Sequence, residues 1–417
     1  MADFFKALKT SVMGALVFGF TVQSALADIV IWEDENMAPG LYQAAKDFKK
    51  QTGIGVTIIE HRYTYALEKL RLDGPAGVGP DLVLLPNDQV SSGAEQGMIE
   101  PIMLSDEDKA DYLPDALRAV TYKKNIYAIP KSIETLGLFY NKDLLEEPFE
   151  TLEEYYRYSL DRQKNGKYGL IASFDDLYYG MSVLEPFGAY IFGKKDGDEY
   201  DIYDIGLNNE GVYNAISYIR KFYDRGAFPS SLLGYYGRHA INDLFTNRKA
   251  AACITGVWQI KPFISSGVNF GVSPLPSLPN GKHMSSFLGV RGFAVSKWSK
   301  HKSEAIEFAK FINQTEYAIK RFETTYELPP LKSALESAVI QKNEYARAFV
   351  IQSKYSYPMP SVPETQAVWQ PFSEALRAIY TGKLEIKKGI DTGVENIREV
   401  IRDMYRDQDD DFGELYK

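Results

Sequence analysis

The chain has 417 residues, of which 45% are hydrophobic and 13% aromatic, and its formal net charge is -9. A chain of this length exceeds one ordinary core, so two lobes are expected. Its 47 basic residues form no sustained block among 56 acidic ones, which argues against a nucleic-acid-binding surface.

The first 27 residues have the pattern of a cleavable secretory signal peptide. Lys6 and Lys9 precede an apolar stretch at 12–22, and small residues at 25 and 27 form a cleavage site. The alternative is an uncleaved membrane anchor, but this stretch is shorter than the ~20 residues that a span requires. The only cysteine, Cys253, excludes an intramolecular disulfide and a lipid-bearing cysteine beside the signal peptide. The sequence therefore predicts export to the periplasm without a lipid anchor.

Strands and helices alternate at the start of the mature chain. Apolar segments at 28–33, 56–60 and 79–85 are typical of strands, and the segment 41–53 is typical of a helix that ends at Gly53. This alternation favours βαβ units and an α/β architecture. Helices with one apolar face are predicted further on, within 210–226 and 303–314.

Two proline-rich segments, 274–287 and 355–363, are predicted to be loops, and the first is a candidate crossing between lobes. The acidic segment 196–201 lacks the glycine and glutamate of a calcium loop, so an exposed turn is expected. The acidic end, 406–417, is expected to be solvated or frayed.

Motifs of the common reaction classes are absent from the sequence. It contains no nucleophile elbow, phosphate-binding loop or dinucleotide fingerprint, and its four histidines lie far apart. We therefore predict no metal and no cofactor. Aromatic residues are plentiful, with 29 tyrosines, 23 phenylalanines and 4 tryptophans, and rings beside polar groups suit the apolar faces and hydroxyls of sugars.

Six segments, in this order and spacing, give the chain its resemblance to a known family: GPDLVLLPNDQ, IETLGLFYNKDLL, GAYIFG, AACITGVWQI, NFGVSPLPSLPNGK and PETQAVWQPF. The chain resembles the maltose/maltodextrin-binding proteins, which are solute-binding proteins of sugar ABC importers. The resemblance runs from about Val30 to about Tyr380.

The resemblance implies a type II periplasmic-binding-protein fold, in which two α/β lobes close on a ligand by bending at a hinge. It places lobe 1 at 28–133 with 288–338, and lobe 2 at 134–287 with 345–417. It also places Glu134 at the cleft floor, in the first crossing between lobes, with Lys131 as a possible charge partner. From the residues alone, a carboxylate that binds hinge amides is an equally good reading of Glu134.

The resemblance assigns further side chains to the ligand. Trp258, Trp369 and Tyr178 match stacking positions, although by burial tendency each is also a reasonable core residue. Asp88 and Asp176 match carboxylates near hydroxyls, although Asn87 or Asp88 could instead cap a helix. Asp34 and Tyr65 are weaker assignments, because the register at the first strand is uncertain and either Tyr63 or Tyr65 could face the cleft.

Two departures from the family pattern bear on specificity. Gln89 stands where maltodextrin binders usually have an arginine, and Leu85 stands where some have an aromatic residue. A cation clamp and one stacking surface are therefore expected to be missing.

The function implied by the resemblance is a non-enzymatic, monomeric periplasmic receptor that passes an oligosaccharide, with maltodextrin leading, to an ABC permease in the inner membrane. One alternative keeps the receptor and changes the solute to another sugar, a polyol or a sugar phosphate. An alternative of another class is a secreted glycan-cleaving enzyme that uses Glu134 with Asp88 or Asp176, since paired carboxylates can hydrolyse glycosides. A protein that has lost its ligand is disfavoured by the retained rings and acids.

Overall fold

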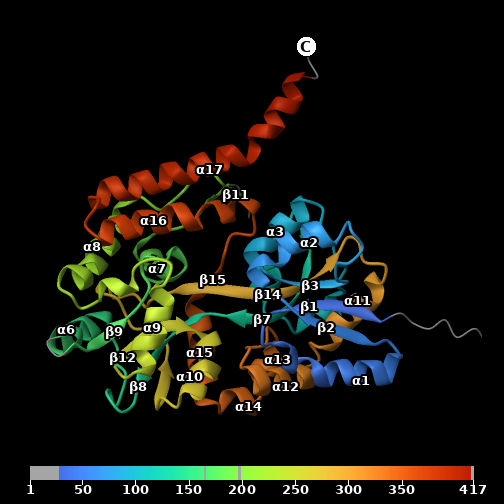
Figure 1. Cartoon of the computed structure of the whole chain (residues 1–417), viewed down its shortest axis with the longest axis horizontal. Helices are drawn as coiled ribbons and strands as arrows, with labels where there is room; N and C mark the ends of the chain where they lie inside the picture. The colour runs from blue at the N-terminus through green and yellow to red at the C-terminus, as the bar shows by residue number, and fades with distance from the viewer. Residues whose placement is uncertain (1–27, 164–165, 196–198, 415–417) are drawn as a thin grey trace, which may run out of the picture.

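The computed structural model describes residues 28–163, 166–195 and 199–414 as two halves side by side, each built on its own sheet (Figure 1). The predicted signal peptide lies outside the described residues, as do 164–165, 196–198 and 415–417. No helix in the described part of the chain has the length and apolar character needed to cross a membrane.

The first half contains a seven-stranded sheet. Its main path runs β15-β14-β3-β1-β2, and β4 and β7 also pair with β14. Strands β1, β2 and β3 are parallel, and β14 pairs antiparallel with β3, β4 and β7. The strands are β1 (Ile29–Glu33), β2 (Val56–Glu60), β3 (Leu82–Pro86), β4 (Ile99–Glu100), β7 (Ala128–Glu134), β14 (Ser286–Ser296) and β15 (Ser356–Pro358).

Helices cover both faces of this sheet. In β3, Leu82 and Leu84 pack in a core with α1 and α11, whereas Val83 and Leu85 pack in a core with α2 and α3. Alternate side chains of a strand point to opposite faces, so a strand buried on both faces is apolar throughout. The helices are α1 (Tyr42–Thr52), α2 (Ala66–Asp73), α3 (Asn87–Glu95), α4 (Asp106–Ala110), α5 (Pro114–Ala119), α11 (Lys302–Phe311), α12 (Thr315–Thr325) and α13 (Lys332–Leu335), and a small hairpin joins β5 (Thr121–Tyr122) to β6 (Asn125–Ile126).

The second half contains a four-stranded sheet with the order β13-β8-β12-β9. Its strands are β8 (Leu136–Asn141), β9 (Tyr168–Ile171), β12 (Ala250–Gly256) and β13 (Phe270–Ser273). Helices surround it, and β10 (Gly193–Lys194) and β11 (Tyr200–Asp201) form a separate two-stranded sheet. The helices are α6 (Leu152–Arg162), α7 (Leu177–Leu184), α8 (Glu210–Asp224), α9 (Gly237–Thr246), α10 (Ile260–Ser266), α14 (Ala338–Gln341), α15 (Glu344–Gln352), α16 (Trp369–Tyr380) and α17 (Ile386–Glu414).

The chain crosses between the halves before β8, before β14 and between α13 and α14, and β15 lies beside the first two crossings. The chain leaves β7 at Glu134 and enters β8 at Leu136, while β14 and β15 begin side by side in parallel. The hydroxyl of Thr135 contacts that of Ser286 and lies 2.9 Å from that of Ser356, and the two serine hydroxyls are 2.7 Å apart. These three short polar side chains tie the first two crossings and β15 together.

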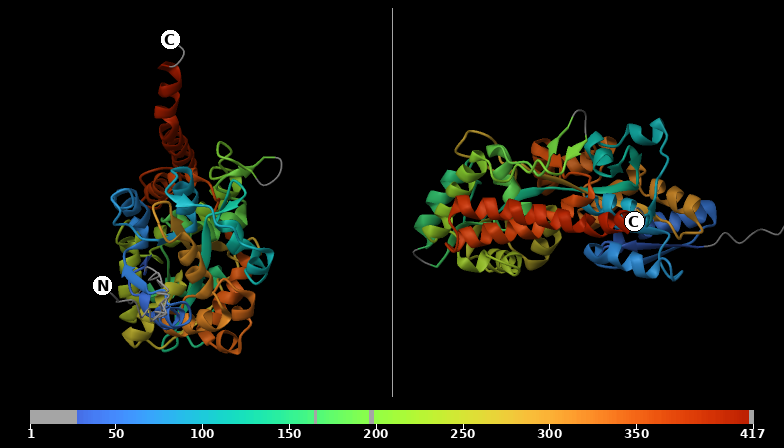
Figure 2. Two further views of the ribbon diagram at one scale, coloured as in Figure 1. Left: turned by 90° about the vertical axis from the view of Figure 1, so that its right-hand side faces the viewer. Right: turned by 90° about the horizontal axis from the view of Figure 1, so that it is seen from above.

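Most predicted elements are confirmed, including the early strands, the helix that ends at the left-handed Gly53, and the two helices with an apolar face. One local prediction was wrong, because the segment 355–363 is not only loop: β15 lies inside it and pairs with β14. Of the predicted acidic turn 196–201, residues 196–198 lie outside the described part, and Tyr200–Asp201 form β11. The acidic end, predicted to be solvated or frayed, continues α17 as far as Glu414 and projects from the body (Figures 1 and 2).

Candidate functional site

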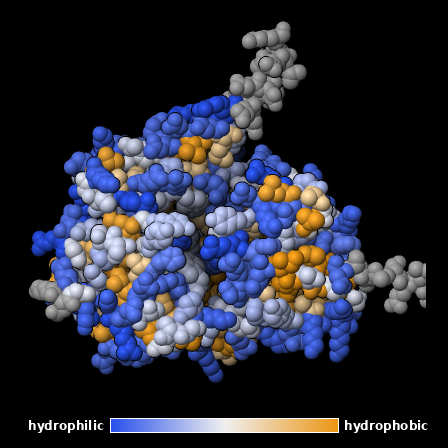
Figure 3. All heavy atoms as spheres, in the orientation of Figure 1, coloured by the Kyte–Doolittle hydropathy of each residue, from blue (hydrophilic) through white to orange (hydrophobic). Residues whose placement is uncertain are grey.

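A cavity of about 460 Å³ lies between the two halves. Its walls come from the start of α3 and from β14 on one side, and from α7, the turn at Val257–Gln259 and the start of α16 on the other. The face shown in Figure 3 is hollowed along the boundary between the halves. This volume falls within the ~300–1,000 Å³ of typical small-molecule sites.

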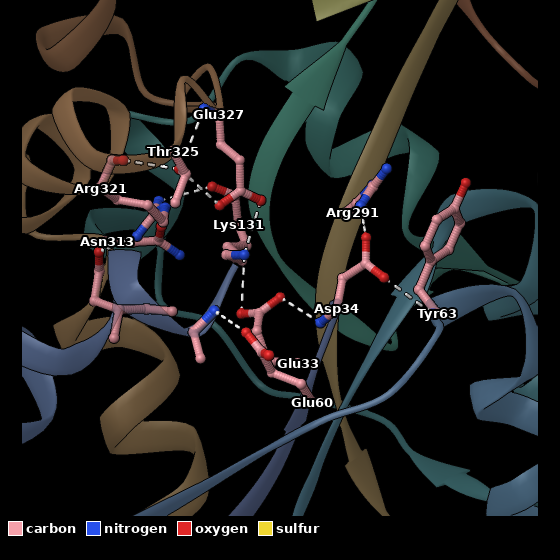
Figure 4. A network of polar contacts seen from close by, with 12 residues as sticks. Glu33, Asp34, Glu60, Tyr63, Lys131, Arg291, Asn313, Arg321, Thr325 and Glu327 are labelled. Atoms are coloured by element: carbon pink, nitrogen blue, oxygen red, sulfur yellow. Dashed lines mark hydrogen bonds and ion pairs between the residues drawn. The ribbon is translucent and has the colours of Figure 1, made fainter. Parts of the chain in front are cut away.

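A charged group forms the floor of the cavity. Arg291 of β14 lies 2.5 Å from Glu134 through Nε and 2.6 Å from Asp34 through Nη1. Its guanidinium also lies over the ring of Tyr63, 4.1 Å from the ring centre (Figure 4). Glu134, Tyr63 and Arg291 line the cavity, whereas Asp34 holds the guanidinium from behind.

Burial governs the protonation of this group. It raises the pKa of the Glu134 carboxyl, and the nearby Arg291 only partly offsets the rise. Burial alone would lower the pKa of Arg291, but Glu134 and the other neighbouring acids outweigh it and the pKa rises, so this cation stays charged. The floor thus presents a fixed positive charge and a carboxylate that takes up a proton more readily than an exposed one.

Lys131 is not the charge partner of Glu134, so that expectation was wrong. Its side chain is 0% exposed and its ammonium lies 2.9 Å from Glu33 and 2.8 Å from Glu327 (Figure 4). The pairing of β7 with β14 shifts at this point, with Ser132 opposite Arg291 and Pro130 opposite Gly292, and the contacts with Glu33 and Glu327 hold the Lys131 side chain away from Glu134. Burial raises the pKa of Glu33. At Glu327 burial acts in the same direction, but Lys131 and Arg321 together with the hydrogen bond from Lys131 outweigh it, and the pKa is lowered.

Aromatic rings form the wall that the second half contributes. Tyr178, Tyr179, Trp258 and Trp369 all line the cavity. The ring centre of Tyr178 lies 6.3 Å from that of Trp258, and both Tyr178 and Trp369 contact Phe287, at 5.7 and 5.8 Å. Phe287 is fully buried, so it supports these two rings from behind.

Local sequence explains how two of these rings are placed. Asp176 caps α7, accepting a hydrogen bond from the Tyr178 amide at 3.1 Å, which fixes where Tyr178 leaves the helix. A side chain at Gly256 would overlap the indole of Trp258, so the glycine lets this ring fold back along the chain. The alternative for Tyr178 and Tyr179 was that they pack inward at the start of a helix. Tyr179 is indeed buried, at 3% exposed, but both tyrosines also line the cavity.

A second acid and cation lie on the same wall. Asp176 and Arg238 both line the cavity. Burial raises the pKa of Asp176, and the charge of Arg238 partly offsets this. Arg238 and Arg291 thus bring two cations to the cavity, whereas the position at which maltodextrin binders usually have an arginine holds Gln89.

Asp88 connects the two halves across the cavity. Its carboxylate and its backbone oxygen accept hydrogen bonds from the side-chain amide of Gln366, at 2.9 and 2.8 Å. Gln366 lies in the short helix Pro363–Ala367, directly before Trp369. Burial raises the pKa of Asp88, partly offset by the bond from Gln366. The capping interpretation does not hold, because Pro86 occupies the N-cap of α3 and no side chain caps the helix.

Two amides at the cavity have unused hydrogen-bonding atoms within the described structure. Asn87 is fully buried; its Oδ1 accepts from the Val290 amide at 3.0 Å, and its Nδ2 has no protein partner. The buried Oε1 of Gln89 also lacks a partner. Buried polar atoms are normally satisfied, so these two are positioned for a ligand or for water.

The structure brings together six of the eight predicted site residues on the cavity wall: Glu134, Asp88, Asp176, Tyr178, Trp258 and Trp369. Of the other two, Asp34 lies behind the floor, and Tyr65 is 58% exposed and is not among the lining residues. Tyr63 lines the cavity in place of Tyr65. Sequence reasoning missed Arg291 and Arg238. Arg291 had a signal, because an arginine inside an otherwise apolar strand must be paired.

Among the described residues, no three His, Cys, Asp or Glu side chains are grouped so that they could hold a metal ion. The cavity offers stacking rings, amides, carboxylates and two arginines. Such a site suits a neutral polyhydroxyl compound.

Two α/β halves with such a cavity between them define a two-lobed binding protein. The model of the bacterial extracellular solute-binding proteins matches residues 43–348. The chain is 38% identical over 378 residues to a galactooligosaccharide-binding protein of Bacillus subtilis, covering 90% of each chain. It is 31% identical to a maltodextrin-binding protein of the same organism, covering 86% of each. The chain belongs to the bacterial extracellular solute-binding protein family.

Solved structures agree with this fold. A cyclo/maltodextrin-binding protein in complex with maltotetraose superposes with a TM-score of 0.82 at 32% identity, covering 90% of this chain and 97% of the other. A periplasmic maltose-binding protein of Listeria monocytogenes in complex with maltose has the same score at 29% identity, covering 91% and 99%. The expected two-lobed periplasmic-binding-protein fold is therefore confirmed.

Proposed function

We propose that this chain is the exported receptor of a sugar ABC importer, and that it binds a neutral oligosaccharide between its lobes and delivers it to the permease. One observation carries the proposal: aromatic rings on the wall of the second half face carboxylates and unpaired amide atoms at the floor and on α3. Rings stack on the C–H faces of a sugar while the polar groups bond its hydroxyls.

The first ligand class we propose is the maltodextrins. Relatives and structural neighbours named for maltodextrin or maltose support it, as do the six segments of the family resemblance. Galactooligosaccharides are the second class, because a relative named for them is 38% identical. Gln89 also supports this second class, because it stands where maltodextrin binders usually have an arginine and its Oε1 has no protein partner.

The finer parts of the proposal follow from the same family. We propose a non-catalytic, monomeric protein without affinity for nucleic acid, exported by the signal peptide 1–27. Its lobes are 28–133 with 288–338, and 134–287 with 345–417, so that Asp88 and Gln366 meet across the cavity. A ligand favours the closed arrangement only if it makes contacts in the closed state that it lacks in the open state, and a sugar that touches both halves does so.

Isothermal titration of residues 28–417 with maltotriose, maltotetraose and matching galactooligosaccharides tests this function. Loss of one stacking ring costs about 0.5–1.5 kcal/mol, so Trp258→Ala and Trp369→Ala are each expected to weaken binding by about 2- to 13-fold. Trp298→Ala, a tryptophan outside the cavity lining, is the matched control.

Two results would overturn the proposal. A folded protein that binds neither sugar series at millimolar concentration would not be a receptor for these solutes. Release of shorter sugars from maltotetraose during overnight incubation, abolished by Glu134→Gln, would identify the glycan-cleaving alternative instead.

A further inference from the structure

The short helix between β15 and α16 connects the cavity to α17. This helix, Pro363–Ala367, has about three residues per turn, so its side chains at positions 364 and 366 point in different directions. Gln366 bonds Asp88 on the cavity wall, whereas Glu364 contacts Tyr405 of α17. The cavity is thus linked to a helix none of whose described residues lines it.

At the cavity end of this link, one amide group fixes the Asp88 side chain. Both bonds come from Nε2 of Gln366, one to the backbone oxygen of Asp88 at 2.8 Å and one to its carboxylate at 2.9 Å. Because the two acceptors belong to the same residue, the two bonds restrain the torsion angles between them. A carboxylate accepts up to about four hydrogen bonds, so Asp88 keeps acceptor capacity for the hydroxyls of a sugar.

At the other end, a buried carboxylate depends on a tyrosine. Glu364 is 6% exposed, and it forms no ion pair with any described residue. The hydroxyl of Tyr405 donates a hydrogen bond to it. Burial and this carboxylate raise the pKa of Tyr405, so the hydroxyl stays protonated and remains a donor. Since a buried carboxylate is costly without such a partner, the bond holds the short helix against α17.

Tyr405 is itself held by the packing of α17. Ile397 and Ile401, on the preceding turns of the same face, are fully buried, and α17 packs on α8, α16 and the short helix. Figures 1 and 2 show that α17 begins over the second half and extends over the boundary between the halves. The hydroxyl of Thr365 adds an anchor by donating to the carbonyl of Pro360 at 2.8 Å.

We propose that Gln366 is a positioning residue of the sugar site, and that the bond between Tyr405 and Glu364 keeps Gln366 in place. This rests on the proposed function and adds two side chains outside the cavity lining to it. Gln366 orients the Asp88 carboxylate toward the sugar hydroxyls. The short helix leads directly into α16, so its position also sets that of the Trp369 indole. Sugar affinity therefore depends on a hydrogen bond made by α17.

Isothermal titration with maltotetraose and galactotetraose tests the first step. Gln366→Met keeps the length of the side chain and removes its donor, so affinity should fall by about 2- to 13-fold, the worth of one hydrogen bond. In an Asp88→Ala background the same substitution should change affinity by less than about twofold, because the residue that it orients is gone. Gln370→Met is the matched control, since Gln370 bonds the exposed Glu374 at 2.9 Å and does not line the cavity.

Tyr405→Phe tests the second step, because it removes a single oxygen atom. Affinity should fall by at least about twofold, with no further loss when Tyr405→Phe is combined with Gln366→Met. Tyr190→Phe is the matched control: Tyr190 also donates to a carboxylate, that of Asp204 at 2.8 Å, and neither residue lines the cavity.

The indole N–H signals in nitrogen–proton correlation spectra, recorded without sugar, give a readout independent of affinity. In Tyr405→Phe the signal of Trp369 should shift from its position in the unsubstituted protein. The signal of Trp298, which lies outside the cavity lining, should stay in place.

The possible results are distinguishable. Unchanged affinity in Gln366→Met, or an undiminished loss in the Asp88→Ala background, would overturn the positioning role. Unchanged affinity and an unchanged Trp369 signal in Tyr405→Phe would overturn the role of α17. Either result leaves the receptor function intact. Failure of every sugar to bind the folded, unsubstituted protein would overturn the receptor function, while the indole signals would still test the link between α17 and the cavity.

Discussion

Replacing Arg291 with methionine should destabilise the protein strongly at neutral pH and much less at acid pH. The guanidinium lies between Asp34 and Glu134, and the three side chains are only 13%, 15% and 9% exposed for Asp34, Glu134 and Arg291. Removing one partner of a buried ion pair costs about 3–5 kcal/mol. Loss of the cation–π contact with Tyr63 adds about 1 kcal/mol.

The pH dependence follows from the carboxyl left behind. Burial already raises the folded-state pKa of Glu134, and without Arg291 nothing nearby offsets this effect. A carboxyl whose pKa is raised on folding favours the folded state below its unfolded pKa, and this contribution is lost as pH rises through the folded pKa. The destabilisation caused by Arg291→Met should therefore be small near pH 4 and grow as pH rises from there.

Urea denaturation of residues 28–417 at several pH values between 4 and 8 measures the effect. At pH 8 we expect the free energy of unfolding to fall by about 3 kcal/mol or more. Arg62→Met is the matched control, because Arg62 pairs with Glu35 at 3.4 Å with side chains 66% and 54% exposed, and should change stability by less than about 1 kcal/mol. A loss below about 1 kcal/mol for Arg291→Met at pH 8, or the same loss at every pH, would refute the reasoning.

Three further predictions concern the same region. Because burial raises the pKa of Glu134 above its usual value of 4.5, sugar affinity should increase as the pH rises above 4.5 and Glu134 loses its proton. In titrations, Glu134→Gln should weaken binding at pH 7 and remove this pH dependence. A pH dependence that is unchanged in Glu134→Gln would show that another group causes it. Gly256→Ala should displace the Trp258 indole and weaken sugar binding, with no further loss in a Trp258→Ala background; additive losses would contradict this mechanism. Lys131→Met should lower the free energy of unfolding by about 3–5 kcal/mol and leave affinity within about twofold, since Glu33 and Glu327 lose their partner outside the cavity lining; a larger affinity loss in titrations would place Lys131 in the binding machinery.

Much of the fold was predictable because it depends on local pattern. The apolar runs of β1 and β3, and the glycine stop of α1, are signals carried by neighbouring residues. The short strand β15 was missed because its three residues are a strand only through pairing with β14, which is distant in sequence. The long helix α17 was not predicted because its first part is supported by packing on α16, which its composition does not reveal.

The candidate site shows the same division. Trp258, Trp369 and Tyr178 could be proposed from recognisable segments, and they do lie on one wall of the cavity. The partner of Glu134 could not be found this way, because Lys131 is near in sequence but is held away from it by two other carboxylates, whereas Arg291 comes from a strand 157 positions later. Which charges meet is decided by strand register, and register is a tertiary property.

The contact of Thr135, Ser286 and Ser356 limits how the two halves can move. Two crossings between the halves, and β15 beside them, are held to one another at a single spot by hydroxyl groups. The hydroxyls of Ser286 and Ser356 are 2.7 Å apart, and those of Thr135 and Ser356 are 2.9 Å apart. Translating one half over the other would break these contacts together, whereas turning about that spot can preserve them. The spot therefore acts as a pivot that favours rotation over sliding, while the segment between α13 and α14 forms a separate connection between the halves. Glu134 is adjacent to this pivot, so a ligand at the cavity floor lies near the axis of rotation, where the two halves move least relative to each other. Rotation carries the aromatic wall, which is farther from the axis, toward that ligand.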